Sequence, residues 1–338
     1  MNTAVQFVLI VDHVTKINRI IKRVKKIKIV YLTGYWYSGA TIIGRSFVCS
    51  NQAIYVGEIR DFWVKGLKQN RKCSCGENFK DCRFWESITN NYFDSFPSSK
   101  IEEITKEMTK FERGKNYFKL RKFIKHKSDE SFRHKLGNYL KHTEKLYEII
   151  SEISGKNIIV DSSRIPVRLL ALSLSKEIEI FPIFVMRDPR GVINSLIKKD
   201  MRNYGENRHN TFSHIINWNA KNLLSLDAMR ILKHNNGMHL LYKTFTKAPT
   251  IIFKNLESKL NCKFIFEEEN DKVSLNLEQG HVFTGNRSRY NFGKITINED
   301  IQWKQQLNGL NKILISIGSL PIYKFIASKY RLNNINIY

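Results

Sequence analysis

The 338-residue chain lacks the features of a membrane protein or of a disulfide-stapled secreted domain. No run approaches the ~20 consecutive apolar residues of a membrane-spanning helix. The apolar N-terminal stretch from Val5 to Val11 has no basic residue before it and ends at Asp12, which is unlike a secretory signal. Five cysteines are too few to staple so long a chain. The sequence therefore predicts a cytoplasmic protein.

Acidic residues are also scarce. The 31 Asp and Glu residues stand against 56 Lys and Arg residues, which gives a formal net charge of +25. Such a surplus attracts anions, whether nucleic acids, acidic lipids and glycans, or small phosphate and sulfate esters. Residues 1–26 form a basic N-terminal segment, and residues 17–26 have the pattern of a short amphipathic helix. A solvated cap on the first strand is the favoured interpretation, and weak peripheral contact with an anionic membrane surface is the alternative.

Short apolar runs, each followed by turn residues, alternate with helical patterns along the chain. The runs predict strands at 27–33, 53–56, 157–160, 180–186 and 238–242, with helices at 41–50, 61–69, 164–175, 190–200, 212–234 and 249–260. This alternation predicts an α/β fold, in which helices flank a parallel sheet on both faces. Residues 95–155 interrupt it with charged helical sequence, which we interpret as an insertion within a single domain spanning 1–338.

The first strand leads into a loop, residues 34–41, that has the layout of a phosphate-binding loop. Gly34, Gly39 and Thr41 match the pattern of the nucleotide triphosphatases, in which backbone N–H groups before a helix point at an anion. Ala40 stands where that pattern needs a lysine, which argues against ATP or GTP hydrolysis. In a parallel sheet such a loop lies at the edge where ligands bind.

A second motif, Arg187-Asp188-Pro189-Arg190, follows the fourth predicted strand. Arg187 offers a fork of donors to a phosphate. Pro189 is suited to the first turn of a helix. Ser195, two helical turns further on, can share the same anion if the chain turns sharply at Pro189.

In this order along the chain, the two motifs resemble the nucleotide-binding elements of sulfotransferases that use 3′-phosphoadenosine 5′-phosphosulfate (PAPS). The resemblance covers roughly residues 27–94 and 156–305. It implies a P-loop-like fold and an in-line transfer of the sulfuryl group from PAPS without a metal. The product nucleotide would be 3′-phosphoadenosine 5′-phosphate (PAP).

The same resemblance implies the nucleotide contacts. The first loop would hold the 5′-phosphosulfate through Tyr37, Ser38, Gly39, Ala40 and Thr41. The 3′-phosphate would be held by Arg187, by Ser195 and by Arg287, which lies in a Gly-Asn-Arg stretch near the C-terminus. For Arg289, a nucleotide contact and plain surface charge both stay open. Tyr37 replaces the basic residue usual in the family, so it donates a hydrogen bond but brings no charge.

Three catalytic roles also follow from the resemblance. A Gly-Glu element makes Glu58 the general base, and Arg164 ends a stretch similar to the family's Asp-Ser-Ser-Lys. Arg164 and Tyr37 would stabilise the leaving side. A purely structural ion pair of Glu58 with Arg60 or Arg164 stays open, and His281 or His214 is a less favoured base.

Cys73, Cys75 and Cys82 cluster before an Arg-Phe-Trp stretch and resemble a loop of the same bacterial enzymes. Three sulfurs fall short of a closed zinc site, and their spacing matches no standard finger. We therefore expect a structural loop and no metal, with a disulfide or a metal as less favoured alternatives.

The acceptor is predicted to be a small molecule or a glycan, and no nucleic acid partner is expected. Bacterial relatives modify natural products, saxitoxin-type toxins among them. The acceptor site is expected to be shaped by residues 95–155, 35–37 and 200–215. Two rival interpretations stay open. One is a nucleotide kinase or NTPase with Asp161 on magnesium, and the other is a non-catalytic polyanion binder.

Overall fold

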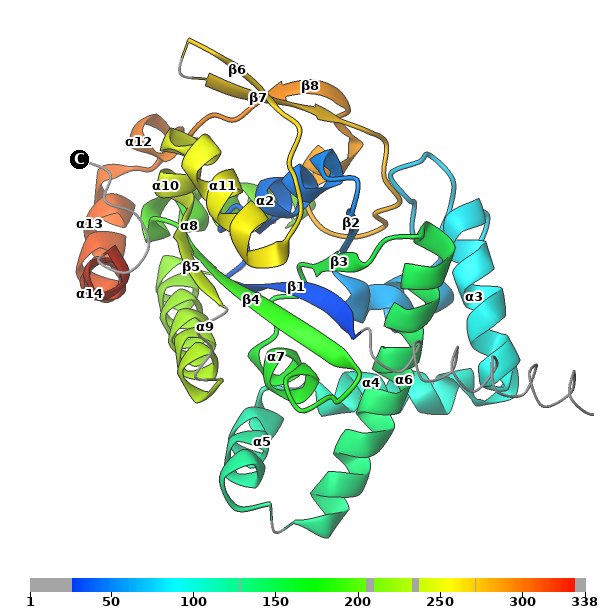
Figure 1. Cartoon of the computed structure of the whole chain (residues 1–338). Coiled ribbons are helices and arrows are strands. Elements are labelled where there is room, and N and C mark those ends of the chain that lie inside the picture. Colours follow the sequence, from blue (N-terminus) through cyan, green and yellow to red (C-terminus); the bar gives the residue numbers. More distant parts are fainter. Residues whose placement is uncertain (1–25, 128, 205–209, 233–236, 271, 332–338) are drawn as a thin grey trace, which may run out of the picture.

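The computed structural model describes residues 26–127, 129–204, 210–232, 237–270 and 272–331. At its centre is a five-stranded parallel sheet with the order β2-β3-β1-β4-β5 (Figure 1). Its strands are β1 (Ile27–Gly34), β2 (Ala53–Gly57), β3 (Ile158–Asp161), β4 (Ile178–Met186) and β5 (Met238–Leu241). The predicted strands and the α/β class are confirmed. The predicted basic N-terminal segment lies outside the described residues, apart from Lys26.

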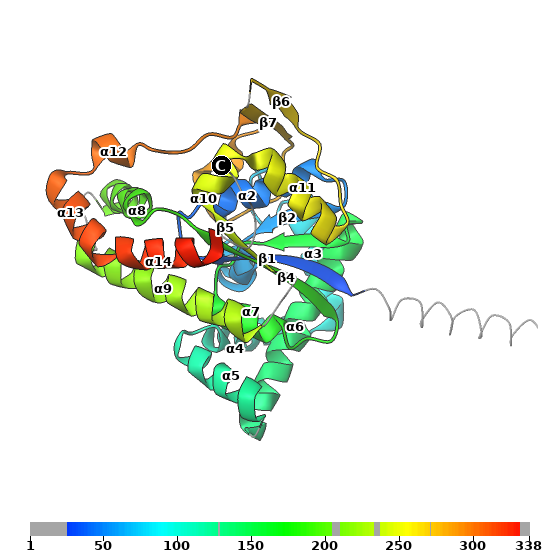
Figure 2. The ribbon, with the colours of Figure 1, turned by 60° about the vertical axis from the view of Figure 1, so that its left-hand side comes forward.

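Helices cover both faces of this sheet (Figures 1 and 2). One face carries α2 (Ala40–Ser46), α10 (Tyr242–Lys247) and α11 (Pro249–Leu260). The other carries α6 (Glu130–Ser154), α7 (Pro166–Leu172) and α9 (Thr211–Ile231). Helix α8 (Pro189–Tyr204) follows β4 and packs against α9.

The central strand shows why the sheet is buried on both sides. Ile29 and Tyr31 of β1 belong to the core beneath α6, α7 and α9, whereas Val30 and Leu32 belong to the core beneath α2, α10 and α11. All four side chains are fully buried. A strand in this position reads as a continuous apolar run rather than an alternating one, which is the signal that predicted it.

The stretch 95–155, which the sequence analysis interprets as an insertion, is largely helical, and its role as an insertion stays a prediction. Its helices are α4 (Ile101–Phe111), α5 (Lys115–His126) and α6, preceded by α3 (Arg83–Ser95). Helix α6 packs against α3, α4 and strand β3, and α5 packs against α7. Short helical turns complete this part of the chain and the strand ends: 3₁₀ helices at Phe47–Cys49, Ile59–Phe62, Ser98–Lys100 and Arg287–Tyr290, and a π-helix at Trp63–Lys68.

Five buried polar residues, called the buried cluster below, connect residues 95–155 to strand β3 and helix α7: Glu112, Tyr139, Tyr147, Asp161 and Arg168. Arg168 of α7 donates to Asp161 (Nε–Oδ2, 3.1 Å) and to Glu112 (Nη1–Oε1, 3.0 Å). Tyr139 and Tyr147 of α6 donate to Glu112 and to Asp161 at 2.7 and 2.6 Å, and they accept from the same guanidinium. All five groups are buried. Burying these charges is tolerated because each one is paired and hydrogen-bonded.

The last part of the chain holds elements that the sequence did not predict. Strands β6 (Glu267–Glu269), β7 (Lys272–Leu277) and β8 (Gly293–Thr296) form a small antiparallel sheet. Helices α12 (Trp303–Gln306), α13 (Gly309–Gly318) and α14 (Leu320–Arg331) follow it. Among the described helices none alone is long and apolar enough to cross a membrane, and only α13 with the start of α14, bent by 50°, meets that test as a pair.

Candidate active site

The polar motifs at the strand ends converge on one cavity of about 490 Å³. This volume lies in the range of small-molecule sites. The predicted site residues that line it are Tyr37, Gly39, Ala40, Thr41, Glu58, Arg164, Arg187 and Ser195. They come from four different strand-to-helix connections, after β1, β2, β3 and β4. The parallel sheet brings them together because its strands all end at the same edge.

The first loop leads from β1 into α2 with an unusual backbone. Tyr37 has φ 60° and Gly39 has φ 96°, so the chain passes twice through the left-handed region. A Cβ on Gly39 would lie 2.2 Å from the ring of Tyr242, which makes glycine the residue that fits. Ser38 is buried between these positions, and its Oγ has no hydrogen-bond partner among the described residues.

Arg187 joins the first loop to the second motif. Its Nη1 donates to the carbonyl oxygen of Tyr37 at 3.2 Å, and its Nη2 lies 3.0 Å from Asp300 Oδ2. The ring of Tyr242 lies beneath the guanidinium, 4.8 Å from ring centre to Cζ. A Cβ on Gly191 would come within 3.0 Å of Arg187 Nε, so this glycine leaves room for the side chain. The two predicted anion-binding loops therefore face the same space.

The sharp turn after Arg187 that shared binding requires is present. Helix α8 begins at Pro189, and the Asp188 carboxylate accepts from the backbone N–H of Arg190 at 2.9 Å. Ser195 lies further along α8 and lines the cavity, where its Oγ donates to the carbonyl oxygen of Gly191 at 2.9 Å.

Glu58 and Arg164 form an ion pair in the cavity wall, between Nη2 and Oε1. Both side chains are more than nine-tenths buried. Arg164 has φ 57°, a strained conformation for a residue with a side chain, and the preceding turn holds it there. Asp161 accepts from the backbone N–H of Ser163 at 2.7 Å in that turn. Arg164 Nε has no hydrogen-bond partner in the described part of the chain.

Burial raises the pKa of the Tyr37 hydroxyl above its usual value near 10, although Arg202 and Arg164 act in the opposite direction. The hydroxyl therefore stays protonated near neutral pH. Tyr37 lines the cavity as a neutral phenol, and its hydrogen bond to a ligand stays a prediction.

The cavity wall also contains cations that the sequence analysis did not assign to it. They are Arg60, Lys65, Arg71, Lys199 and Arg289. With Arg164 and Arg187 they make seven cationic side chains, against the two carboxylates Glu58 and Asp300. Such an imbalance gives the cavity a strong positive potential.

Arg287 does not lie where the sequence analysis placed it, and its neighbour Arg289 does line the cavity. Arg287 is exposed and is not among the residues that line the cavity, whereas Arg289 lines it. Their 3₁₀ turn is attached to α2, because Arg45 donates to the backbone carbonyls of Ser288 and Asn291. Arg45 is buried and was not singled out from the sequence.

Two other groups singled out from the sequence lie elsewhere. Asp161 does not line the cavity, since its carboxylate is engaged by Arg168, Tyr147 and Ser163 in and beside the buried cluster. His281 lies beside the cysteines, where its Nδ1 is 3.2 Å from Cys82 Sγ.

No protein-family model and no curated protein matches the sequence. Among solved structures, the chain is similar to a sulfotransferase domain from the curacin biosynthetic pathway, over 91% of this chain and 98% of that one, with 14% identity and a TM-score of 0.44. It is also similar to a sulfotransferase from Mycobacterium avium, over 74% and 67%, with 8% identity and a TM-score of 0.41. Likenesses at this level assign neither an activity nor a ligand to this chain.

Proposed function

We propose that the chain is a sulfotransferase that uses PAPS as its sulfuryl donor. The observation that carries the proposal is the meeting of two anion-binding loops at one cavity, where Arg187 contacts the Tyr37 carbonyl and cations outnumber carboxylates seven to two. A bisphosphate-like donor carries an anionic group at each end, which suits such a cavity. Ser38 Oγ, Arg164 Nε and Thr284 Oγ1 are buried without partners in the described residues. Anionic oxygens would complete their hydrogen bonding.

The first loop holds the 5′-phosphosulfate through the backbone amides around Gly39 and the hydroxyl of Ser38. Arg187 and Ser195 hold the 3′-phosphate. We assign the third contact to Arg289 in place of Arg287, because Arg289 lines the cavity. When the 3′-phosphate enters, it competes with Asp300 for the Arg187 guanidinium.

Transfer to the acceptor is a single in-line displacement. The acceptor oxygen or nitrogen forms a bond to sulfur while the bond from sulfur to the phosphate oxygen breaks, and both electrons of that bond leave with PAP. Glu58 takes the acceptor proton. Arg164 and the Tyr37 hydroxyl stabilise the charge that develops on the sulfuryl and phosphate oxygens.

The acceptor in this proposal is a small molecule or a glycan, with saxitoxin-type toxins as one natural-product class. Trp36 lines the cavity beside Tyr37 and leaves 41% of its surface exposed, so it offers an aromatic face at the entrance. Among the described residues of 95–155, none lines the cavity, and the insertion reaches it through the ion pair of Glu112 with Arg60. A role of the insertion in acceptor choice stays a prediction, as does a cytoplasmic location.

Equilibrium binding separates this proposal from its rivals. Isothermal titration calorimetry at fixed salt should give saturable one-to-one binding of PAP and weaker binding of Mg-ATP. A nucleotide kinase would give the reverse order. A non-catalytic polyanion binder would bind PAP and heparin alike, with affinity that falls steeply with salt. Either of these results, or no heat with PAP, contradicts the proposal.

The chemistry is tested with Glu58→Gln. We expect transfer of radiolabelled sulfate from PAPS to acceptors in an extract of the source cells to fall about 10²- to 10⁴-fold, because a general base contributes that much. PAP affinity should stay within about threefold, since the substitution keeps the shape of the side chain and its oxygen acceptor. The control is Asp227→Asn, a half-buried carboxylate of α9 that pairs with Arg121 and does not line the cavity. Equal losses in both variants would remove Glu58 from the mechanism.

A further inference from the structure

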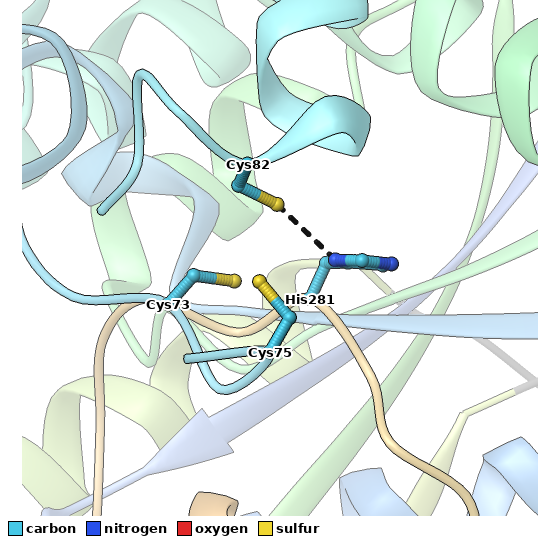
Figure 3. A group of neighbouring side chains, drawn as sticks. All are labelled: Cys73, Cys75, Cys82 and His281. Carbon is cyan, nitrogen blue, oxygen red and sulfur yellow. Dashed lines mark hydrogen bonds between the residues drawn. The ribbon is translucent and has the colours of Figure 1, made fainter. Parts of the chain in front are cut away.

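Four potential metal ligands meet in a loop region next to the cavity. Cys73, Cys75, Cys82 and His281 each offer one ligand atom, and these atoms all lie within 4.8 Å of one another. Figure 3 shows the three sulfurs and the imidazole turned toward a common centre. Cys73 and Cys82 are buried, and Cys75 and His281 are half-buried. His281 is the fourth ligand that the cysteine spacing alone could not supply.

The cysteine loop is folded so that the sulfurs converge. A tight reversal carries Cys73 and Cys75, closed by a hydrogen bond from Cys73 N–H to the Glu77 carbonyl at 2.7 Å. Gly76 has φ 102° in this turn, a conformation that suits glycine. Cys82 precedes α3 at its N-terminal end. The three thiols are therefore brought together by backbone structure.

His281 is held in place by contacts that involve no sulfur. Its carbonyl oxygen accepts from Trp85 Nε1 at 2.9 Å, and its ring stacks on Phe84 at 4.9 Å between centres. Ser74, which lies between the first two cysteines, donates its N–H to the Val282 carbonyl at 3.0 Å and accepts the Val282 N–H at 2.9 Å. The fourth ligand is thus positioned before any ion binds.

We propose that Cys73, Cys75, Cys82 and His281 bind one structural zinc ion. Three sulfurs and one imidazole nitrogen are a common closed tetrahedral set for zinc, with no position left for water. A tetrahedral site with Zn–S bonds of about 2.3 Å places its ligand atoms about 3.8 Å apart. The observed separations, all within 4.8 Å, need only a small contraction. A disulfide would use two of the three thiols and leave the third beside His281 without a partner.

The zinc ion fixes two segments of the cavity wall. Arg71 lines the cavity two residues before Cys73, and Phe283 lines it two residues after His281. Arg289 lies at the end of the same segment. Coordination therefore stabilises the fold and holds the wall in position, and it takes no part in the transfer chemistry. Metal binding itself does not depend on the proposed sulfotransferase activity.

The test measures zinc directly on the full chain, purified under reducing conditions, stripped with a chelator and reloaded with zinc chloride. Elemental analysis after dialysis should find one zinc per chain. In Cys75→Ser and His281→Ala, which change the two half-buried ligands, the affinity for zinc should fall about 100-fold, since each ligand carries a share of the total binding free energy. Cys262→Ser is the matched control, because Cys262 is a buried cysteine outside the cluster and should keep one zinc.

Chelation gives a second readout. It should lower the unfolding temperature of the native chain and of Cys262→Ser, and it should lower that of His281→Ala less, because zinc bound about 100-fold more weakly stabilises the variant less. Cobalt in place of zinc should give the visible absorption of a tetrahedral thiolate site. A reduced, folded chain that retains no zinc would overturn the proposal. So would a disulfide among the three cysteines, or iron in place of zinc. None of these readouts involves a nucleotide, so they are separate from the test of the proposed function.

Discussion

Two arginines of this protein, Arg164 and Arg168, lie four residues apart in the sequence and differ in how they are paired. Arg168 in the buried cluster donates hydrogen bonds to two carboxylates and two phenols, so its partners all come from the protein itself. Arg164 in the cavity wall has one carboxylate partner, Glu58, and an Nε donor without a partner in the described residues. The same residue type stabilises the fold in one region, and in the other it keeps a donor free for the ligand that we propose.

The difference is one of charge balance. In the buried cluster, one guanidinium meets the carboxylates of Asp161 and Glu112, and Glu112 also pairs with Arg60. In the cavity wall, Arg60 and Lys65 pair with Glu112 and Asp61, and Arg164 and Arg187 pair with Glu58 and Asp300. The other three cations of the wall, Arg71, Lys199 and Arg289, form no ion pair with a carboxylate within the described residues. A region that is balanced needs nothing further. A region with excess cations and unpartnered donors is completed by an anion.

The largest expected effect is on the balanced region. Arg168→Met should lower the free energy of unfolding by about 3–5 kcal/mol, because it leaves two buried carboxylates without their cation. Urea unfolding followed by circular dichroism measures this. Arg71→Met, which removes an exposed arginine from the cavity wall, should change stability by no more than about 0.5 kcal/mol. Similar losses in the two variants would erase the distinction between the regions.

A smaller effect is expected on ligand binding. Arg187→Gln should weaken PAP binding about 10- to 150-fold, since hydrogen bonds to a charged group contribute about 1.5–3 kcal/mol. The control is Arg190→Gln, three residues on, whose guanidinium pairs with Asp188 and does not line the cavity. Calorimetric titration with PAP compares the two. A loss of affinity in the control as large as that in Arg187→Gln would place the 3′-phosphate elsewhere.

The smallest effects are expected for Ser38→Ala, and they should differ in sign between the stability of the free protein and its affinity for PAP. Ser38→Ala removes a buried hydroxyl that has no partner among the described residues, so the free protein should be unchanged or up to about 1 kcal/mol more stable. PAP affinity should nevertheless fall up to about fivefold, a loss of about 1 kcal/mol. Ser46→Ala is the control, because Ser46 Oγ already donates a hydrogen bond to the Ile43 carbonyl at 2.7 Å and that bond is lost in the variant. It should lose stability and keep its affinity for PAP.

The sheet could be predicted because its strands carry a strong signal. Strands buried on both faces are continuous apolar runs, and β1 and β4 appear in the sequence as such. The small antiparallel sheet could not be recognised in the same way. Strand β6 is three exposed glutamates, which have no strand pattern of their own. Strand β7 does alternate, with Val273, Leu275 and Leu277 buried, and this period of two was available in the sequence.

The site was predictable where it depends on strand ends and not where it depends on distant contacts. Lys199 could have been found, because it lies one helical turn after Ser195 on the same face of α8. Arg289 could not be chosen over Arg287 from the sequence. The orientation of their 3₁₀ turn depends on Arg45, which is 243 residues before the Ser288 carbonyl that it binds. The position of His281 beside the cysteines could not be predicted either, since 199 residues separate it from Cys82 in the sequence.

Glu112 occupies a position that restricts how this protein can be redesigned. One of its oxygens binds Arg168 inside the fold and the other binds Arg60 in the cavity wall. Anyone who exchanges residues 95–155 for another set of helices, in order to redirect the choice of acceptor, must graft in a carboxylate and two phenols at the places of Glu112, Tyr139 and Tyr147. A replacement segment without them leaves the Arg168 guanidinium buried without these partners, and the chimera is then too unstable for its selectivity to be assayed.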